Sequence, residues 1–316
     1  YNCSVYIHMF KRQIVLSGII LSSLTTTAQT AKCYRYKDII FSDVNIEKNL
    51  SYRPDAPKGE EKSYRFNLYR AKGDTVSNRP LIIWMHGGGF KFGSKDVNSI
   101  ELWSKTFAQR GYVCAAINYR LSKKNTIFHF DELLKASYFA VQDAKRAVEY
   151  FKKHHEEYHI DPDKIILAGN SAGGIIALQA AYSSNADLAK LAKLPDTVEG
   201  AKTREIFKIA GVINLWGAIF DLGWLKNAHV PVVNILGNKD SIVPPTHKSA
   251  PLYGGVDIHT KADELKIPNT LKVFDGYSHE LRKHFNPLFP SSKSTHQRWL
   301  GAGQYAADFL YGQLFK

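Results

Sequence analysis

The sequence predicts an α/β domain in which a mostly parallel central sheet is covered by helices on both faces. The first observation is a rhythm: from about residue 63, short apolar runs alternate with longer amphipathic segments, as in repeated strand-helix units. The second is size, because 316 residues with 44% hydrophobic content can bury one large core. The third is continuity, since we find no repeat, low-complexity tract or long linker that would divide the chain.

Each regular element follows from its own pattern. Helical spacing of apolar residues is clearest over residues 132–155, and Pro162 ends that segment. A second helix is expected to begin at Ser171 or just after it, and a third pattern, over 297–315, packs the C-terminal helix on the sheet. Seven apolar runs are expected to form strands: 64–69, 80–86, 113–118, 164–168, 210–215, 232–236 and 270–274.

The first thirty residues have the pattern of a secretory signal peptide. Lys11 and Arg12 precede an apolar run over 14–24, and small residues follow, with cleavage expected after Ala28. We therefore expect upstream residues plus a signal peptide over 1–28, an N-terminal segment over 29–62 and the main domain over 63–316. The expected location is secreted or periplasmic. No later run approaches the ~20 apolar residues of a bilayer-spanning helix, so no membrane span is expected.

Cysteine content and charge restrict the partners. Cys33 and Cys114 remain once Cys3 leaves with the leader, but Cys114 lies in an apolar run where a buried free thiol is the expected state. The net charge is +13, yet the basic residues are scattered and show no aromatic-interleaved stripe, so a nucleic-acid partner is not expected. Attraction to acidic polysaccharide is a secondary reading of this basic surface. The oligomeric state stays open.

Ser171 lies in the segment Gly169-Asn170-Ser171-Ala172-Gly173-Gly174, between a predicted strand and a predicted helix. This is the context of a nucleophile elbow, a sharp turn that presents a serine hydroxyl above the sheet. Gly169 and Gly173 fit the turn because residues without a Cβ let strand and helix pass closely. The G-x-S-x-G motif alone is weak evidence, since it occurs by chance in about one chain in ten of this length.

The run His86-Gly87-Gly88-Gly89 is a more specific signal, expected by chance on the order of once in several hundred chains. It follows a predicted strand. Such a loop can direct the backbone N–H groups of Gly88 and Gly89, together with that of Ala172, toward a developing oxyanion. Phosphate-binding glycine patterns are absent from the sequence, so a nucleotide site is not favoured.

A serine nucleophile needs a base and an orienting carboxylate, and both follow Ser171 in the chain. Asp240 comes directly after the predicted strand 232–236, and His279 comes shortly after 270–274. Because the carboxyl ends of parallel strands share one edge, we expect the three side chains to meet. Rival acids and the rival base rank lower: Asp221, Asp275 and His284. His154, His155 and His159 are interpreted as a solvated helix end.

At these residues the sequence resembles the esterase and lipase branch of the α/β-hydrolase superfamily, specifically a carbohydrate-esterase-like group with bacterial feruloyl and acetylxylan esterases. The resemblance covers roughly residue 63 to the end of the chain, and its segments include 118–122, 143–148, 160–165, 240–244 and 253–255. Asn170 and the short polar segment 29–62 depart from the hormone-sensitive-lipase-like pattern of Asp before the serine and a helical cap. The resemblance therefore implies little or no cap domain.

The resemblance implies acyl transfer to water with Ser171, His279 and Asp240 as the triad and without a metal or organic cofactor. The expected substrate is a small-molecule or polysaccharide-linked ester, with acetyl and feruloyl groups both open. Phe128, Phe130 and Tyr253 are aromatic candidates for a cleft wall. An amidase, peptidase or formamidase on the same scaffold stays an alternative. So does a non-catalytic binding protein, although no triad position is substituted.

Overall fold

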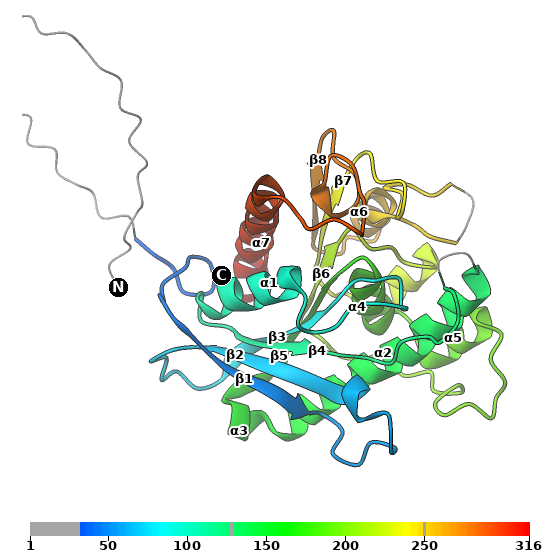
Figure 1. Ribbon diagram of the computed structural model, residues 1–316, viewed down its shortest axis with the longest axis horizontal. Helices are drawn as coiled ribbons and strands as arrows, with labels where there is room; N and C mark the ends of the chain where they lie inside the picture. Colours follow the sequence, from blue (N-terminus) through cyan, green and yellow to red (C-terminus); the bar gives the residue numbers. More distant parts are fainter. Residues whose placement is uncertain (1–31, 127–128, 249–250) are drawn as a thin grey trace, which may run out of the picture.

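The computed structural model describes residues 32–126, 129–248 and 251–316, built around one eight-stranded sheet (Figure 1). The strand order is β1-β2-β4-β3-β5-β6-β7-β8. Strands β3 to β8 run parallel, whereas β2 is antiparallel to both of its neighbours. The strands are β1 (Val44–Ser51), β2 (Arg65–Ala71), β3 (Arg79–Met85), β4 (Val113–Ile117), β5 (Ile160–Asn170), β6 (Gly211–Leu215), β7 (Val232–Gly237) and β8 (Asn269–Phe274).

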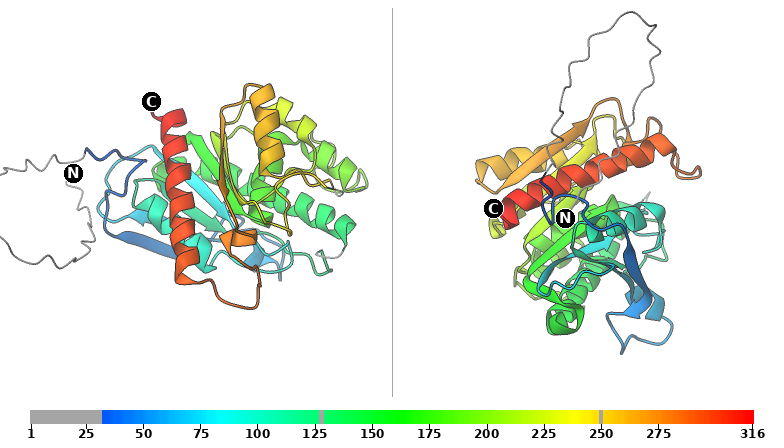
Figure 2. Two further views of the ribbon diagram at one scale, coloured as in Figure 1. Left: turned by 90° about the horizontal axis from the view of Figure 1, so that it is seen from above. Right: turned by 90° about the vertical axis from the view of Figure 1, so that its left-hand side faces the viewer.

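Helices cover both faces of this sheet, as Figures 1 and 2 show. Helices α1 and α7 pack together on one face, and α2 and α4 lie on the other. The helices are α1 (Asn98–Ala108), α2 (Phe130–Lys153), α3 (His155–Tyr158), α4 (Ala172–Tyr182), α5 (Asn185–Leu191), α6 (Gly255–Glu264) and α7 (Lys293–Leu314), with 3-10 turns η1 (Glu61–Tyr64), η2 (Leu222–Asn227) and η3 (His279–Leu281).

The two hydrophobic cores follow from strand alternation. In β3, Leu81 and Ile83 belong to the core under α2 and α4, whereas Ile82 and Trp84 belong to the core under α1 and α7. Successive side chains of a strand point to opposite faces, so a strand covered on both sides reads as a continuous apolar run. This is why the central strands could be located from the sequence. The predicted α/β-hydrolase fold is confirmed.

Trp103 connects several elements in the second core, the one under α1 and α7. Its ring is fully buried and stacks on Trp84 at a centroid distance of 5.5 Å, and it lies 5.8 Å from both Trp216 and Trp299. The indole Nε1–H donates to the carbonyl oxygen of Trp299 (3.0 Å). One side chain of α1 therefore contacts β3 and α7 at once.

The sheet begins before the expected boundary at residue 63. Strand β1 lies inside the 29–62 segment and pairs with β2 from Val44↔Ala71 to Ser51↔Arg65, so that segment contributes to the same sheet. Strand β5 also begins earlier than expected and includes Pro162. Its pairing with β3 shifts register between Arg79 and Leu81, and a proline without an N–H is tolerated at such an irregularity.

Three further expectations concern Cys114, a membrane span and the signal peptide. Cys114 is a buried free thiol, as predicted. Within the described ranges, no helix is both long and apolar enough to cross a bilayer. The expected signal peptide and its cleavage after Ala28 lie outside the described residues.

We predict that Trp103→Ala lowers the free energy of unfolding by about 3–5 kcal/mol, because it leaves a cavity among three other indoles. Trp103→Phe keeps a ring but loses the hydrogen bond to Trp299, and we expect a loss of about 1–2 kcal/mol. Urea unfolding followed by fluorescence and circular dichroism measures both. A loss below 1 kcal/mol in the alanine variant would show that this contact does not hold the core.

Candidate active site

Ser171 occupies the turn between β5 and α4 in a conformation that only a tight elbow imposes. Its φ is 53° and its ψ is −118°, a region that residues with a side chain rarely adopt. The strain is held in place from both sides, because its N–H donates to the carbonyl of Leu215 (2.9 Å) and its carbonyl accepts from Ile175. The side chain is 9% exposed.

Two glycines allow this turn to form. A Cβ on Gly173 would lie 2.0 Å from the carbonyl oxygen of Met85, and one on Gly169 would lie 2.4 Å from the carbonyl carbon of Gly173. Both distances are below any real contact. The start of α4 therefore touches the backbone at the end of β3, and only glycine fits at these positions, as the sequence pattern indicated.

The structure brings the three expected side chains together in one hydrogen-bonded chain. The Oγ of Ser171 lies 2.9 Å from His279 Nε2, and His279 Nδ1 lies 2.7 Å from Asp240 Oδ2. All three residues are buried. With Nδ1 donating to the carboxylate, Nε2 is left to accept the serine proton, which is the arrangement that general-base activation requires.

Asp240 is fixed by the backbone around it. Its other carboxylate oxygen, Oδ1, accepts the N–H groups of Ile242 (2.9 Å) and Val243 (3.0 Å). These bonds leave Oδ2 facing His279.

The Asp240 and His279 loops are also joined to each other. Lys239 donates its N–H to the carbonyl of Tyr277 (2.9 Å), and Asn238 accepts the N–H of Gly276 (2.8 Å). A Cβ on Gly237 would lie 2.3 Å from that same Tyr277 oxygen. Two loops separated by some forty residues therefore form one rigid unit.

Helix α7 holds the far side of the His279 loop, a support that the sequence patterns did not reveal. Trp299 Nε1–H donates to the carbonyl of Glu280 (2.8 Å), and Arg298 Nε–H donates to that of Leu281 (2.7 Å). Phe285 covers the imidazole edge-on at 4.9 Å. These contacts restrict rotation of the imidazole and exclude water from one side of it.

The Gly-rich loop (residues 86–93) lies against the serine. A Cβ on Gly87 would lie 3.2 Å from that of Ser171, and the N–H of Gly87 donates to Asn170 Oδ1 (3.1 Å). Across the described part of the chain, the N–H groups of Gly88, Gly89 and Ala172 have no protein acceptor. Unpaired N–H groups beside a nucleophile are what an oxyanion site needs.

His86 and Tyr119 hold the base of this loop. Their rings stack at 4.3 Å, the Tyr119 hydroxyl donates to the His86 carbonyl (2.7 Å), and His86 Nδ1 donates to the Gly87 carbonyl (2.7 Å). Burial of the imidazole lowers the pKa of His86 to about 4. His86 is therefore neutral at ordinary pH, and its role is to hold the Gly-rich loop in position. Tyr119 belongs to a resembling segment but was not singled out as a site residue.

The alternative acids and the alternative base, Asp221, Asp275 and His284, are not part of this hydrogen-bonded chain. Asp221 caps η2 by accepting the N–H of Gly223 (2.7 Å), and Asp275 accepts a side-chain bond from Asn238 (2.5 Å). His284 is exposed. The His154–His159 cluster ends a helix, where His154 pairs with Glu157 (2.9 Å).

The aromatic cleft candidates have other neighbours. Phe130 packs edge-on against Phe220, and Tyr253 stacks on His247. Phe128 lies outside the described residues. Across the described ranges, no three His, Cys, Asp or Glu side chains are grouped closely enough to hold a metal ion.

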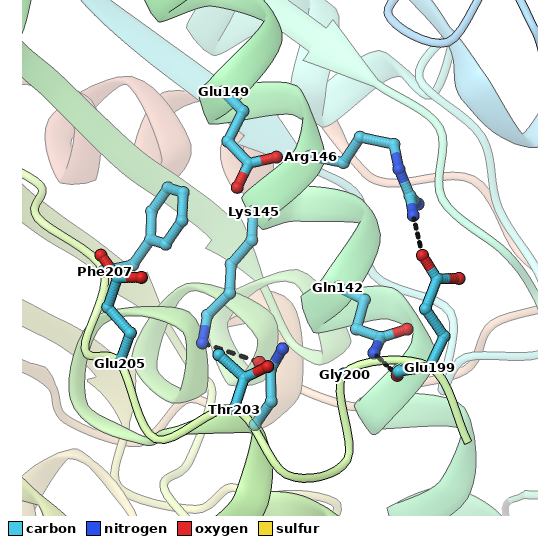
Figure 3. A pocket seen from close by; sticks show the side chains of 10 residues that line it. Gln142, Lys145, Arg146, Glu149, Glu199, Gly200, Thr203, Glu205 and Phe207 are labelled. Carbon is cyan, nitrogen blue, oxygen red and sulfur yellow. Dashed lines mark hydrogen bonds and ion pairs between the residues drawn. The ribbon is translucent and has the colours of Figure 1, made fainter. Parts of the chain in front are cut away.

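A cavity of about 190 Å³ beside α2 contains none of the predicted site residues (Figure 3). Lys145 enters it and donates to the carbonyl of Ser183 (3.2 Å) and to Asn185 Oδ1 (2.9 Å). Burial lowers the pKa of Lys145 to about 8. These bonds join α2 to the end of α4, so we assign Lys145 a structural role.

We predict that His86 makes stability depend on pH between about 4 and 6.5. In this window the unfolded chain binds a proton that the native chain excludes, so the free energy of unfolding falls as pH decreases, by up to about 1.4 kcal/mol per pH unit. Urea unfolding from pH 4.5 to 6.5 should show a slope lower by about one proton in His86→Gln. His284→Gln serves as the exposed control, and an unchanged slope in His86→Gln would contradict the assignment.

Comparisons with known proteins bear on the fold and the family. In solved structures, Thermogutta terrifontis esterase 2 phosphorylated by paraoxon aligns with a TM-score of 0.56 at 20% identity, covering 86% of this chain and 95% of that one. A truncated carbohydrate esterase from gut microbiota aligns with a TM-score of 0.55 at 16% identity, covering 88% and 98%. These similarities support the fold.

Curated relatives match over shorter regions. A probable carboxylic ester hydrolase, LipM, of Mycobacterium tuberculosis is 36% identical over 112 residues, which is 35% of this chain and 23% of the relative. Arylacetamide deacetylase of Bos taurus is 32% identical over 171 residues, or 53% and 38%. The chain thus spans well under half the length of these relatives.

The family comparison covers more than half of the chain, since the BD-FAE family matches residues 66–237, from β2 through the elbow to the end of β7. The resemblance to α/β-hydrolase esterases is thereby confirmed, and the chain belongs to the BD-FAE family.

Proposed function

We propose that this protein is a serine carboxylic-ester hydrolase that acts on short acyl or feruloyl esters of carbohydrate. The observation that carries the proposal is the buried chain of hydrogen bonds from Ser171 Oγ through His279 to Asp240. It ends on a serine held in a strained turn, and the N–H groups of Gly88, Gly89 and Ala172 have no acceptor among the described residues. In this proposal Ser171 is the nucleophile, His279 the base and Asp240 the orienting acid, and the three N–H groups are the oxyanion donors.

In the first half of the proposed reaction, Ser171 Oγ attacks the ester carbonyl carbon while its proton passes to His279 Nε2. The carbonyl oxygen becomes an oxyanion that accepts hydrogen bonds from Gly88, Gly89 and Ala172. The tetrahedral intermediate collapses, the C–O bond to the alcohol breaks, and His279 returns the proton to the leaving alkoxide. The products are the free alcohol and an acyl group esterified to Ser171.

In the second half, water replaces the alcohol. His279 removes a proton from the water, whose oxygen attacks the acyl carbon, and a second oxyanion forms at the same donors. Collapse releases the carboxylic acid and returns the proton to Ser171. Asp240 orients the ring and stabilises the imidazolium, a role that suits a carboxylate whose other oxygen accepts two N–H bonds.

The names of similar proteins guide the substrate panel. Relatives are named a carboxylic ester hydrolase and an arylacetamide deacetylase, and one structural neighbour is named a carbohydrate esterase. Short nitrophenyl esters, acetylated and feruloylated oligosaccharides and an N-acetyl arylamine should therefore be compared side by side. Faster cleavage of the arylamine than of every ester would favour an amidase.

We predict that Ser171→Ala lowers kcat for a short nitrophenyl ester by a factor on the order of 10⁴–10⁶ with little change in unfolding temperature. The hydroxyl is the attacking group, and its removal leaves the backbone contacts of the elbow in place. Ser77→Ala, at an exposed serine between β2 and β3, is the matched control. Activity retained in Ser171→Ala would place the nucleophile elsewhere.

We further predict that Asp240→Asn lowers kcat by on the order of 10³–10⁴, because the amide no longer accepts the Nδ1 proton of His279. Asp275→Asn and Asp221→Asn should lose less than threefold, since Asp275 accepts a bond from the Asn238 side chain and Asp221 caps a turn, and neither contacts His279. Steady-state rates at one pH, with circular dichroism to verify folding, provide the ranking. A larger loss in Asp275→Asn or Asp221→Asn would reassign the acid.

A further inference from the structure

A second cavity lies beside a segment that is hydrogen-bonded to the Gly-rich loop. It has a volume of about 530 Å³ and lies between the turn at residues 59–63 and the start of α2. We call it the basic groove and define it by Arg120, Leu121, Lys123, Lys124, Lys135 and Phe139. None of these residues takes part in the proposed acyl transfer.

One wall of the basic groove also supports the Gly-rich loop. Ser122 donates its N–H to the carbonyl of Phe90 (2.8 Å), and the Thr126 hydroxyl donates to the carbonyl of Gly89. Lys91 of the Gly-rich loop donates to the carbonyl of Lys123. The segment at residues 120–126 therefore connects the lining of the groove to the Gly-rich loop.

The charge of the basic groove is positive where it is exposed. Arg120 is committed to the buried carboxylate of Asp143 (2.7 Å). The ammonium groups of Lys124 and Lys135 share one carboxylate, that of Glu132, at 3.3 Å and 3.2 Å.

The ammonium group of Lys123 has no carboxylate partner in the described part of the chain. Glu60 also lines the groove, and its carboxylate accepts from the Tyr64 hydroxyl (3.2 Å). The groove is thus lined by three lysines, at positions 123, 124 and 135, and by two carboxylates, those of Glu60 and Glu132.

The remaining lining combines apolar side chains with Gly59, Ser63 and Ser122. Leu121 is 37% exposed, and Phe139 and Ala136 form the adjoining surface on α2. A sugar ring presents C–H faces to such a surface and hydroxyls to its rim, and a uronic acid adds a carboxylate that Lys123, together with the two lysines that share Glu132, attracts. A neutral glycan would leave the lysines without counter-charge.

We propose that the basic groove binds a uronic acid unit of the carbohydrate whose ester is cleaved, so that the protein prefers esters of acidic oligosaccharides. The inference rests on the proposed function and narrows its substrate class. Attraction of exposed charges is screened by salt, so the preference should weaken as ionic strength rises.

The test compares two substrates that differ only in charge. One is an acetylated oligosaccharide that carries uronic acids, and the other is the same material after its carboxyl groups are reduced to alcohols. We expect a kcat/KM at least fivefold higher for the acidic form at low salt, and a ratio near one at 0.5 M NaCl. A ratio near one at low salt would overturn the inference.

Charge reversal locates the effect. In the double variant Lys123→Glu, Lys124→Glu, kcat/KM for the acidic form should fall about five- to twentyfold, while that for the reduced form changes less than twofold. Lys153→Glu, Lys190→Glu makes the same charge change at exposed helical lysines elsewhere. An equal fall in this control, or none in the first variant, would refute a local site.

A binding measurement separates this inference from the proposed function. Ser171→Ala is titrated with the deacetylated acidic oligosaccharide, with and without the two lysine replacements. Loss of binding on replacement supports the groove even if no ester is cleaved. Equal binding by both proteins refutes the groove, whereas absence of turnover on all esters refutes only the proposed function.

Discussion

The backbone contact between the start of α4 and the end of β3 is the constraint on which the site depends. Gly173 lies so close to the carbonyl of Met85 that no Cβ fits between them. Met85 is followed directly by His86 and the Gly-rich loop, and Gly173 follows Ser171 by two residues. One contact therefore sets the distance between the serine and the N–H groups expected to stabilise charge on the substrate. The strain at Ser171 is sustained because neither the end of β3 nor the start of α4 can move away without opening the core.

A different kind of support fixes the base and the acid. Their loops follow β7 and β8 and are hydrogen-bonded to each other through Lys239 and Tyr277. Trp299 of α7 donates a further hydrogen bond to the backbone of the His279 loop. Trp299 also contacts Trp103 on α1. The second core thus extends from the middle of the sheet to the His279 loop, and packing far from the serine bears on the position of the imidazole.

Much of this arrangement could be predicted because it is encoded locally. Strands covered on both faces appear as apolar runs, and the elbow and Gly-rich loop need glycine at fixed positions, whatever the rest of the chain does. Strand β1 could not be located in this way, since most of it is partly or fully exposed and its sequence, Val44–Ser51, is largely polar. Its conformation comes from pairing with β2. The support of His279 by Trp299 and Phe285 was equally hidden, because it joins residues whose proximity only the fold creates.

The segment at residues 118–126 contacts the Gly-rich loop with one set of groups and lines the basic groove with another. Its contacts to the Gly-rich loop are made by the Tyr119 ring and hydroxyl, the Thr126 hydroxyl and backbone groups of Ser122 and Lys123. The side chains of Leu121, Lys123 and Lys124 point to the basic groove and carry none of these bonds. Such side chains can change without disturbing the N–H groups beside the serine. If the protein acts as proposed, such a scaffold keeps one reaction while its neighbouring surface sets the choice of carbohydrate, so the groove, more than the triad, should reveal the natural ester.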